Sequence, residues 1–410
     1  MSGSSQLFWF GAGASKGYTG SKTGQLPPLA SEFFTIFNQL EVAANPFVRV
    51  GHIVNYVKRT RNVEIYKFEH WNENIEDFLT ELAERIAELP APNRGELSPE
   101  WIENTRAFDQ MLFLFECVLN EIQNGLKCDL YSKLLAEHAE IDSIITFNWD
   151  CILDRAAWDS QRWTPDRGYG IEFNAFYENG WRKEDNSQPT EFQILKMHGS
   201  TNWLTPYTSF HFETGQRVYS DDRFDESSPC RACFVRSNSP YPTYGDRHKI
   251  GYSPFSYFYY PPNLPDWMCN ATPNRDHERT KFSIVLAPDL GNTGEIKLGD
   301  QPLYSSPLMV GPLRDKDYSL GGGCFDTIWE SACRKIAEHQ DVTIIGYSFP
   351  KTDIRSIQLL KEAQKKAKST IRITLVDPYA EHIVDRLADS LGNPFEITGI
   401  SATLSDWLGS

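Results

Sequence analysis

Five short, largely apolar segments are spread over the whole chain, and each stops abruptly at small or polar residues. They occupy residues 7–10, 143–147, 192–197, 342–345 and 371–376. Their length and composition are typical of strands buried on both faces, as in a parallel sheet. Between several of them, apolar residues recur three and four positions apart, which indicates helices packed on one side. The alternation predicts an α/β fold, a doubly wound Rossmann-like parallel sheet with polar residues at the carboxyl ends of its strands.

Two long stretches interrupt this alternation. Residues 29–140 are mostly helical in pattern, and Ser98 before Pro99 has the residue types of an N-cap and a first-turn proline. Residues 201–281 are rich in aromatic residues, proline and serine with weak periodicity, which predicts an irregular insertion. A strand-like segment follows at 282–287. We expect one domain over residues 1–410, with 29–140 and 201–281 as embellishments on the sheet.

The charge balance excludes several classes of partner. The chain has 40 Lys and Arg against 55 Asp and Glu, a formal net charge of −15. This charge repels phosphate backbones, and the short basic run at 361–368 has the spacing of a solvated helix face, so we expect no direct nucleic-acid binding. The first residues lack a secretory signal, and no apolar stretch is long enough to cross a membrane. We therefore expect a cytoplasmic protein.

The eight cysteines do not suggest a disulfide framework. Those that lie singly in apolar or helical segments are predicted to be reduced core residues: Cys117, Cys151 and Cys333. Cys230 and Cys233 form one C-x-x-C pair, but a structural zinc needs four ligands. The other candidates lie at irregular spacing: Cys269, His248 and His277. We expect no required zinc site.

The first strand-like segment leads directly into residues 11–15, Gly-Ala-Gly-Ala-Ser. Glycine at a strand-to-helix turn allows backbone amides to approach a pyrophosphate. The next glycine is Gly17, so the spacing departs from G-x-G-x-x-G, and a purely structural turn is the alternative. The following stretch, 16–27, is rich in glycine and lysine and predicts a mobile loop able to close over a nucleotide.

Polar side chains also follow two other predicted strands. Thr146, Asn148 and Asp150 alternate, so all three are predicted to face the same side, although Asp150 could instead cap the next helix. His198 and Gly199 follow the segment 192–197. A histidine there can be structural, but the carboxyl ends of strands in open α/β sheets are where ligands bind.

Two further strand ends carry groups suited to a nucleotide. Gly346 allows close backbone approach, and Ser348 can donate to a phosphate or ribose. Asp377 can accept a hydrogen bond from a ribose hydroxyl. The alternative is that Gly346 and Asp377 are turn residues.

Taken in order, these motifs resemble the sirtuin-like superfamily, and more closely its bacterial branch of antiviral-defence NAD⁺ hydrolases. Residues 11–15 match the phosphate-binding opening and 146–150 the threonine-x-asparagine-x-aspartate signature. Residues 198–199 match the catalytic histidine-glycine pair and 346–348 the ribose and phosphate site. The glycine-isoleucine-proline-x-phenylalanine-arginine segment of the deacylases does not follow residue 15. The helical block and the Gly-Tyr-Ser-x-Pro-x-x-Asp pattern at 346–353 look like the defence branch.

The resemblance implies an enzyme that uses NAD⁺ as its substrate and releases nicotinamide and ADP-ribose. Asn148 would hold the ribose or orient a water, His198 would act as general base, and Asp150 would orient or stabilise the cation. The nucleotide would be bound by Gly11, Ala12, Gly13, Ser15, Thr146, Gly346, Ser348 and Asp377. A homo-oligomer and a partner ATPase encoded nearby are expected. An NAD⁺-dependent protein deacylase and a non-catalytic NAD⁺ or ADP-ribose sensor are the alternatives.

Overall fold

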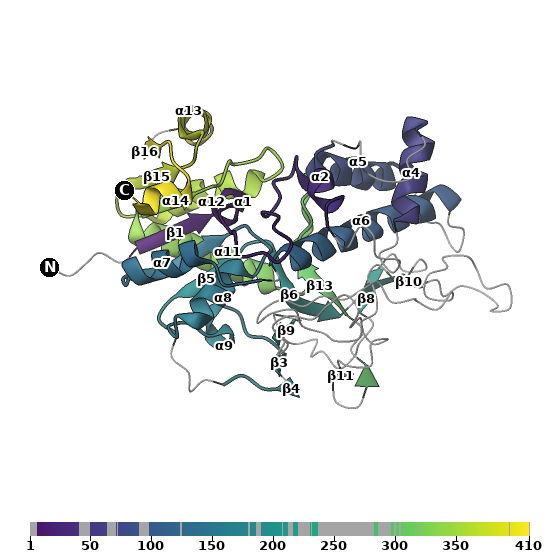
Figure 1. The fold of residues 1–410 in the computed structure, drawn as a ribbon, viewed down its shortest axis with the longest axis horizontal. Helices are drawn as coiled ribbons and strands as arrows, with labels where there is room; N and C mark the ends of the chain where they lie inside the picture. The colour runs from purple at the N-terminus through teal and green to yellow at the C-terminus, as the bar shows by residue number, and fades with distance from the viewer. Residues whose placement is uncertain are drawn as a thin grey trace.

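The chain builds a six-stranded sheet, parallel throughout, which lies toward the left of Figure 1. Its strands in chain order are β1 (Gln6–Phe10), β2 (Ile141–Thr146), β5 (Gln193–Lys196), β14 (Asp341–Ile345), β15 (Ile371–Val376) and β16 (Phe395–Ile400). In space they lie in the order β16-β15-β14-β1-β2-β5, and each neighbouring pair is parallel. Numbered along the chain within this sheet and taken from the β5 edge, this is the order 3-2-1-4-5-6 of doubly wound dinucleotide-binding folds. The predicted fold class is confirmed.

This description rests on a computed structural model. It covers residues 6–40, 50–63, 71, 73–89, 98–123, 125–178, 181–185, 190–206, 208–211, 216–219, 230, 232–236, 283–285, 297–298, 301–302, 305–319, 321–392 and 394–409. None of the helices in these ranges is long and apolar enough to cross a membrane.

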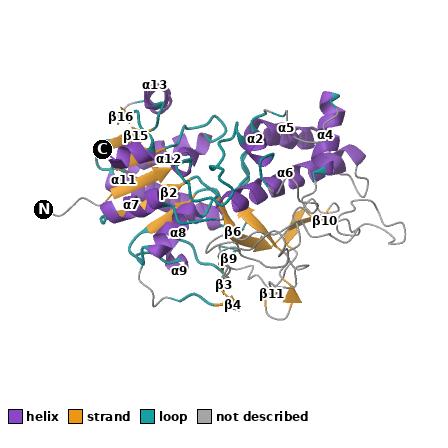
Figure 2. Cartoon of the chain, in the orientation of Figure 1, coloured by secondary structure: helices purple, strands orange, loops and turns teal. Residues whose placement is uncertain are grey.

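Helices cover both faces of the sheet (Figure 2). The connections β1-β2-β5 and β14-β15-β16 run outward from the centre in opposite directions, so right-handed crossovers place their helices on opposite faces. The first group packs together as α7 (Asp129–Glu137), α8 (Ile152–Asp159) and α14 (Leu404–Gly409). The second comprises α11 (Cys324–His339), α12 (Ile354–Lys366) and α13 (Ala380–Leu391). The buried strands and the inner faces of these helices form one continuous hydrophobic cluster.

A separate helical unit follows the first strand and lies at the right of Figure 1. It contains α2 (Phe33–Phe37), α4 (Gly51–Arg61), α5 (Ile75–Glu88) and α6 (Pro99–Gln123). As predicted, Pro99 begins a helix and the Ser98 hydroxyl accepts a hydrogen bond from the Trp101 amide at 3.1 Å. The apolar faces of these helices build a second hydrophobic cluster of their own.

The segments after β2 and β5 add several outer strands. A five-stranded sheet has the order β13-β6-β9-β3-β4, from β3 (Ala175–Glu178), β4 (Trp181–Arg182), β6 (Gly199–Pro206), β9 (Cys233–Arg236) and β13 (Ser305–Met309). Smaller elements are α1 (Ala12–Ser15), α9 (Pro165–Gly168), β7 (Thr208–His211), β8 (Gln216–Tyr219), β10 (Ser283–Val285), β11 (Lys297–Leu298) and β12 (Gln301–Pro302). The strand predicted at 282–287 is β10, which pairs antiparallel with β7 and not with the central sheet. Much of 201–281 lies outside the described residues, and its described parts include the strands β6 to β9.

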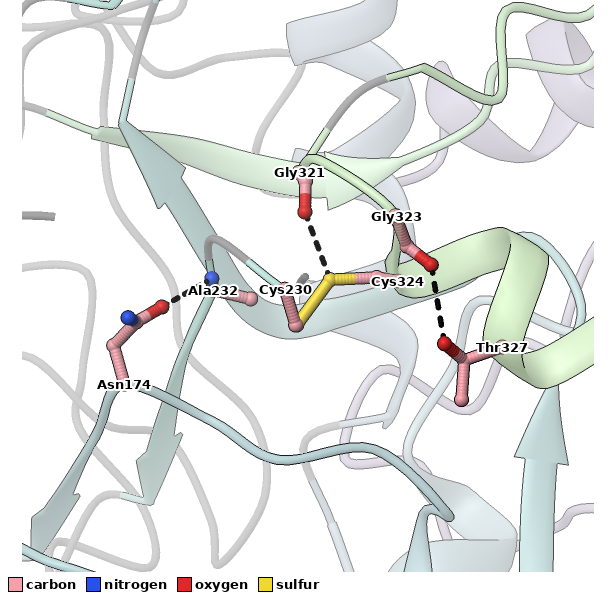
Figure 3. Close-up of a disulfide and its surroundings, with 7 residues drawn as sticks. All are labelled: Asn174, Cys230, Ala232, Gly321, Gly323, Cys324 and Thr327. Atoms are coloured by element: carbon pink, nitrogen blue, oxygen red, sulfur yellow. Dashed lines mark hydrogen bonds between the residues drawn. A yellow bond between two sulfur atoms is a disulfide. The ribbon is translucent and has the colours of Figure 1, made fainter. Parts of the chain in front are cut away.

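Cys230 and Cys324 form a disulfide that joins the insertion to the first residue of α11 (Figure 3). The sequence did not predict it, because the two cysteines are 94 residues apart and only the fold brings them together. While it is intact, Cys230 cannot serve with Cys233 as a zinc thiolate. The other zinc candidates, Cys269, His248 and His277, lie outside the described residues. The three cysteines predicted to be reduced core residues are buried thiols.

Candidate active site

The predicted motifs meet at the centre of the sheet. β1 lies between β2 and β14, so the chain leaves β1 first toward one edge and later toward the other. This reversal is the topological switch point, where open α/β sheets bind ligands. Backbone hydrogen bonds connect the turns that follow the three strands. The Gly11 amide donates to the Ile345 carbonyl at 3.1 Å, and the Phe147 amide donates to the Phe10 carbonyl at 3.0 Å.

The glycines of two motifs pack directly on each other. The Gly13 amide donates to the Gly346 carbonyl at 2.9 Å, and Gly346 has a φ of +62°. A Cβ added to Gly346 would lie 2.3 Å from the Ala14 nitrogen, and one added to Gly11 would lie 2.6 Å from the Gly346 oxygen. These glycines are therefore required for two turns to touch. The Gly13 amide is used inside the protein and does not face a phosphate.

Two side chains of the next motif, Asn148 and Asp150, bond to Ser15. Its hydroxyl donates to Asp150 Oδ2 at 2.9 Å and accepts from Asn148 Nδ2 at 3.0 Å. Asn148 Nδ2 also donates to the Gly11 carbonyl at 2.9 Å. Thr146 Oγ1 accepts from the Asn148 amide at 3.2 Å and shapes the turn that presents this side chain. Asn148 and Asp150 thus face the same side, while Asp150 Oδ1 also accepts from the Ile152 amide at 3.0 Å, as a cap would.

A buried ion pair supports Asp150 from behind. Lys196 Nζ donates to the Asp150 carbonyl at 2.5 Å and lies 3.1 Å from Asp154 Oδ2, and both charged side chains are fully buried. Tyr169 donates its phenolic hydrogen to Asp154 as well. Burial raises the pKa of the Asp150 carboxyl above its usual value, and the Lys196 charge opposes part of that rise. The sequence analysis did not identify Lys196 or Asp154. The two residues lie in β5 and α8, and only the fold brings them into contact.

A small cavity of about 80 Å³, partly open to solvent, lies over this cluster. Ala12, Ser15, Asn148 and Asp150 line it, so four of the predicted site residues share one hollow. The helical unit closes the other side, through Leu29, Phe33, Ile75, Glu76, Phe115 and Leu119. The second hydrophobic cluster therefore supplies a mainly apolar wall, opposite the polar floor formed by Ser15, Asn148 and Asp150.

His198 lies close by but does not line the cavity. Its side chain is 4% exposed and stacks on Trp149, which does line the cavity, with ring centroids 5.4 Å apart. Nε2 is 3.5 Å from Asp353 Oδ2, and neither ring nitrogen makes a hydrogen bond to any residue in the described part of the chain. Gly199 has a φ of +78°, and a Cβ there would lie 2.0 Å from the Leu308 carbonyl oxygen, so this glycine serves the turn.

The last two predicted residues are placed apart from the cavity. Ser348 is exposed, and its carbonyl accepts from Arg386. Asp377 Oδ1 accepts from the Tyr379 amide at 2.8 Å, which is the turn role considered as an alternative. Burial raises the pKa of the Asp377 carboxyl. Neither residue is among those that line the cavity over Ser15.

Comparison with known proteins leaves the family open. No protein-family model and no curated protein matches the chain. Among solved structures it is similar to a Sir2 homologue in complex with NAD, at 10% identity and a TM-score of 0.37 over 99% of this chain and 87% of that one. A mutant Sir2 homologue in complex with ADP-ribose gives 10% identity and a TM-score of 0.34 over 99% and 90%. These values are too low to carry an argument about function, and the fold class rests on the strand order.

Proposed function

We propose that this protein is an NAD⁺ glycohydrolase. The observation that supports it most is the cavity at the switch point of a 3-2-1-4-5-6 sheet, with Ser15, Asn148 and Asp150 bonded to one another on its floor. In the reaction, water adds to the anomeric carbon of the nicotinamide ribose as the N-glycosidic bond breaks. Nicotinamide leaves as a neutral molecule, and ADP-ribose and one proton are the other products.

Asn148 is the group suited to the ribose or the attacking water. The Gly11 carbonyl can only accept, so the atom facing it must be the amide nitrogen. Nδ2 then gives its two protons to Gly11 and Ser15. The amide is held in one orientation, and its oxygen is the atom that would accept from a ribose hydroxyl or from water.

Asp150 is the group suited to the charge that develops during bond cleavage. Departure of nicotinamide leaves an oxocarbenium-like ribose, and a fixed carboxylate in a water-poor site stabilises such a cation strongly. His198 would take the proton from the ribose hydroxyl or from water. Because His198 lies behind Trp149 in this structure, the substrate would have to reach it past that ring.

One observation favours a second candidate, a non-catalytic NAD⁺ or ADP-ribose sensor. The burial of His198 away from the cavity leaves a site that could bind a nucleotide without a base in contact with it. A protein deacylase has no comparable support among the described residues.

We also propose the biological setting that the motif resemblance implies: NAD⁺ depletion in bacterial antiphage defence, in the cytoplasm, by a homo-oligomer with a partner ATPase. The chain would act as a single catalytic domain over residues 1–410, because the cavity is lined from both the sheet and the helical unit.

The test is to incubate the pure protein with NAD⁺, with and without an acetyl-lysine peptide and the co-expressed ATPase, and to separate the products by chromatography. We expect nicotinamide and ADP-ribose in equal amounts without any peptide. Cleavage only with the peptide, with O-acetyl-ADP-ribose as product, would establish deacylation instead. Calorimetric binding of NAD⁺ without cleavage under every condition would favour the sensor.

A further inference from the structure

The turn that follows β14 delivers a carboxylate to His198. Asp353 stands at the N-cap position of α12, where an aspartate side chain usually accepts from a helix amide, yet it makes no such bond. The Ser356 amide and hydroxyl bond instead to the Asp353 carbonyl, at 3.1 and 2.7 Å. The carboxylate is left free to turn inward. The turn that places it contains Phe349 at a φ of +51°, a conformation that is rare for a bulky residue.

Inside the protein this carboxylate has a restricted set of neighbours. Asp353 is 2% exposed, and its Oδ2 accepts from the Tyr347 hydroxyl at 2.5 Å and lies 3.5 Å from His198 Nε2. Its Oδ1 makes no hydrogen bond to a described residue, and Lys316 Nζ is 4.0 Å away. Burial favours the neutral acid, but His198, Lys316 and Tyr347 together outweigh it and keep the pKa of Asp353 below its usual value. The group is therefore an anion at neutral pH.

An anionic carboxylate can only accept, so it favours a proton on the imidazole nitrogen that faces it, Nε2 at 3.5 Å. The opposite nitrogen, Nδ1, is buried and makes no hydrogen bond within the described ranges. Phe147 meets the ring edge-on with centroids 5.0 Å apart, and Trp149 stacks on it at 5.4 Å, so two aromatic rings hold the plane of the imidazole. A neutral histidine held this way presents a lone pair on Nδ1.

We propose that Asp353 is a positioning residue that fixes the proton of His198 on Nε2 and leaves Nδ1 as the proton acceptor. The part of the inference that concerns catalysis rests on the proposed NAD⁺ cleavage; the pairing of the two side chains does not. Asp353 acts through His198 and touches no substrate. In hydrolase triads a carboxylate orients the catalytic histidine in the same way. Replacing that carboxylate with an amide holds the histidine in the wrong tautomer.

Charged and phenolic groups surround this pair. Lys316, Tyr347 and Tyr318 face it, Glu76 faces Lys316, and Arg355 lies over the Tyr318 ring.

The decisive experiment is ¹⁵N NMR of the wild-type protein with labelled histidine. The chain has nine histidines, so the signal is assigned as the one missing from His198→Gln. We expect the neutral form of His198 to carry its proton on Nε2. A proton on Nδ1 in the wild type would overturn the inference even if every variant failed to fold.

The variant Asp353→Asn extends the test to activity. We expect kcat/KM for NAD⁺ to fall by about 10²–10⁴-fold and Asp353→Glu to recover part of the loss. Asp142→Asn is the matched control, because Asp142, near the start of β2, lies 3.0 Å from Nε2 of His339, the last residue of α11. It should change the His339 signal alone. Unchanged kcat/KM and an unchanged His198 tautomer in Asp353→Asn would contradict the inference, whereas absence of cleavage by the wild type would contradict only the proposed function.

Discussion

At the scale of single residues, the hydrogen bonds of Ser15 can be given a direction. A hydroxyl donates one proton, and Ser15 gives it to Asp150. The bond of 3.0 Å between Ser15 and Tyr131 must then run from the tyrosine, and Asn148 fills the second acceptor position. Four buried side chains therefore have one consistent arrangement, which holds the amide and the carboxylate in place before any ligand arrives.

The first prediction concerns the two residues expected to carry the chemistry. Asn148→Ala and His198→Ala should each lower NAD⁺ cleavage by about 10²–10⁴-fold, because one removes the group that holds ribose or water and the other removes the base. Nicotinamide release measures activity, and thermal melting followed by circular dichroism checks the fold. Ser390→Ala is the control, since its exposed hydroxyl bonds only to a carbonyl in its own helix. Near-normal turnover in either variant, with a normal melting curve, would show that the assigned roles are wrong.

A second prediction uses the thiol beside Asp150. Burial raises the pKa of Cys151 to about 12 and that of Cys128 to about 11. Since the thiolate is the reactive form, and its population falls tenfold for each pH unit below the pKa, neither should react with iodoacetamide at pH 8 in the native protein. Labelling should rise as the pH approaches 11, first at Cys128. Mass spectrometry of the digested protein measures it, with a urea-unfolded sample as the positive control. Rapid labelling of Cys151 at pH 8 would mean that the cavity floor opens.

At the scale of elements, the loop 16–27 was predicted from the sequence to be mobile, but its first residues are held by burial and hydrogen bonds. Tyr18 is fully buried, and the Leu126 amide donates to Gly20 at 2.8 Å. Arg155 fixes this contact from α8: it donates to Tyr18 and to the carbonyls of Gln123, Gly125 and Leu126, at 2.9–3.1 Å. The loop that borders the cavity is thus tied to the end of α6.

The third prediction follows from this clamp. Arg155→Met should destabilise the protein by about 1–3 kcal/mol, because the buried Gly125 carbonyl loses its side-chain donor and the Gln123 and Leu126 carbonyls keep only the Tyr18 hydroxyl. Arg155→Lys should recover little, since a single ammonium cannot span the fork of acceptors. Trypsin should cut faster after Lys22 and Lys127, which flank the clamp. Arg334→Met, in α11, is the control. Equal cleavage rates in wild type and Arg155→Met would show that the clamp does not hold the loop.

At the scale of the whole molecule, one covalent link crosses between the outer strands and the sheet's helical layer. Cys230 and Cys324 close a loop of 94 residues, and Cys324 begins the helix that packs under β1, β5 and β14. A cross-link over such a loop stabilises chiefly by restricting the unfolded chain. While this disulfide is intact, Cys230 is a disulfide partner and is not available as a metal ligand.

The fourth prediction tests that choice. A peptide map of protein purified without reductant should contain the linked Cys230 and Cys324 peptides, and Cys324→Ser should lower the free energy of unfolding by about 2–5 kcal/mol. Cys333→Ser, which removes a thiol from the same helix, should leave the linked peptides intact. Metal analysis should find no stoichiometric zinc. Stoichiometric zinc with unfolding on chelation would overturn this prediction and make the deacylase alternative stronger.

The sequence by itself determined the layout of the central sheet, because strands buried on both faces must be continuously apolar and those runs are visible without a fold. It missed β16, whose residues are half-buried or exposed and so form no such apolar run. Its prediction that Thr146, Asn148 and Asp150 face the same side depended only on local spacing; in the fold Asn148 and Asp150 both contact Ser15, and Thr146 bonds to the Asn148 backbone.

Tertiary structure decided everything that depends on residues distant in sequence. The packing of Gly11 on Gly346, the disulfide and the approach of Asp353 to His198 each join segments separated by tens to hundreds of residues. It also set Trp149 between the cavity and His198. Periodicity reports which face of an element is buried, but not which other element buries it; that is fixed by how the helices and sheets pack.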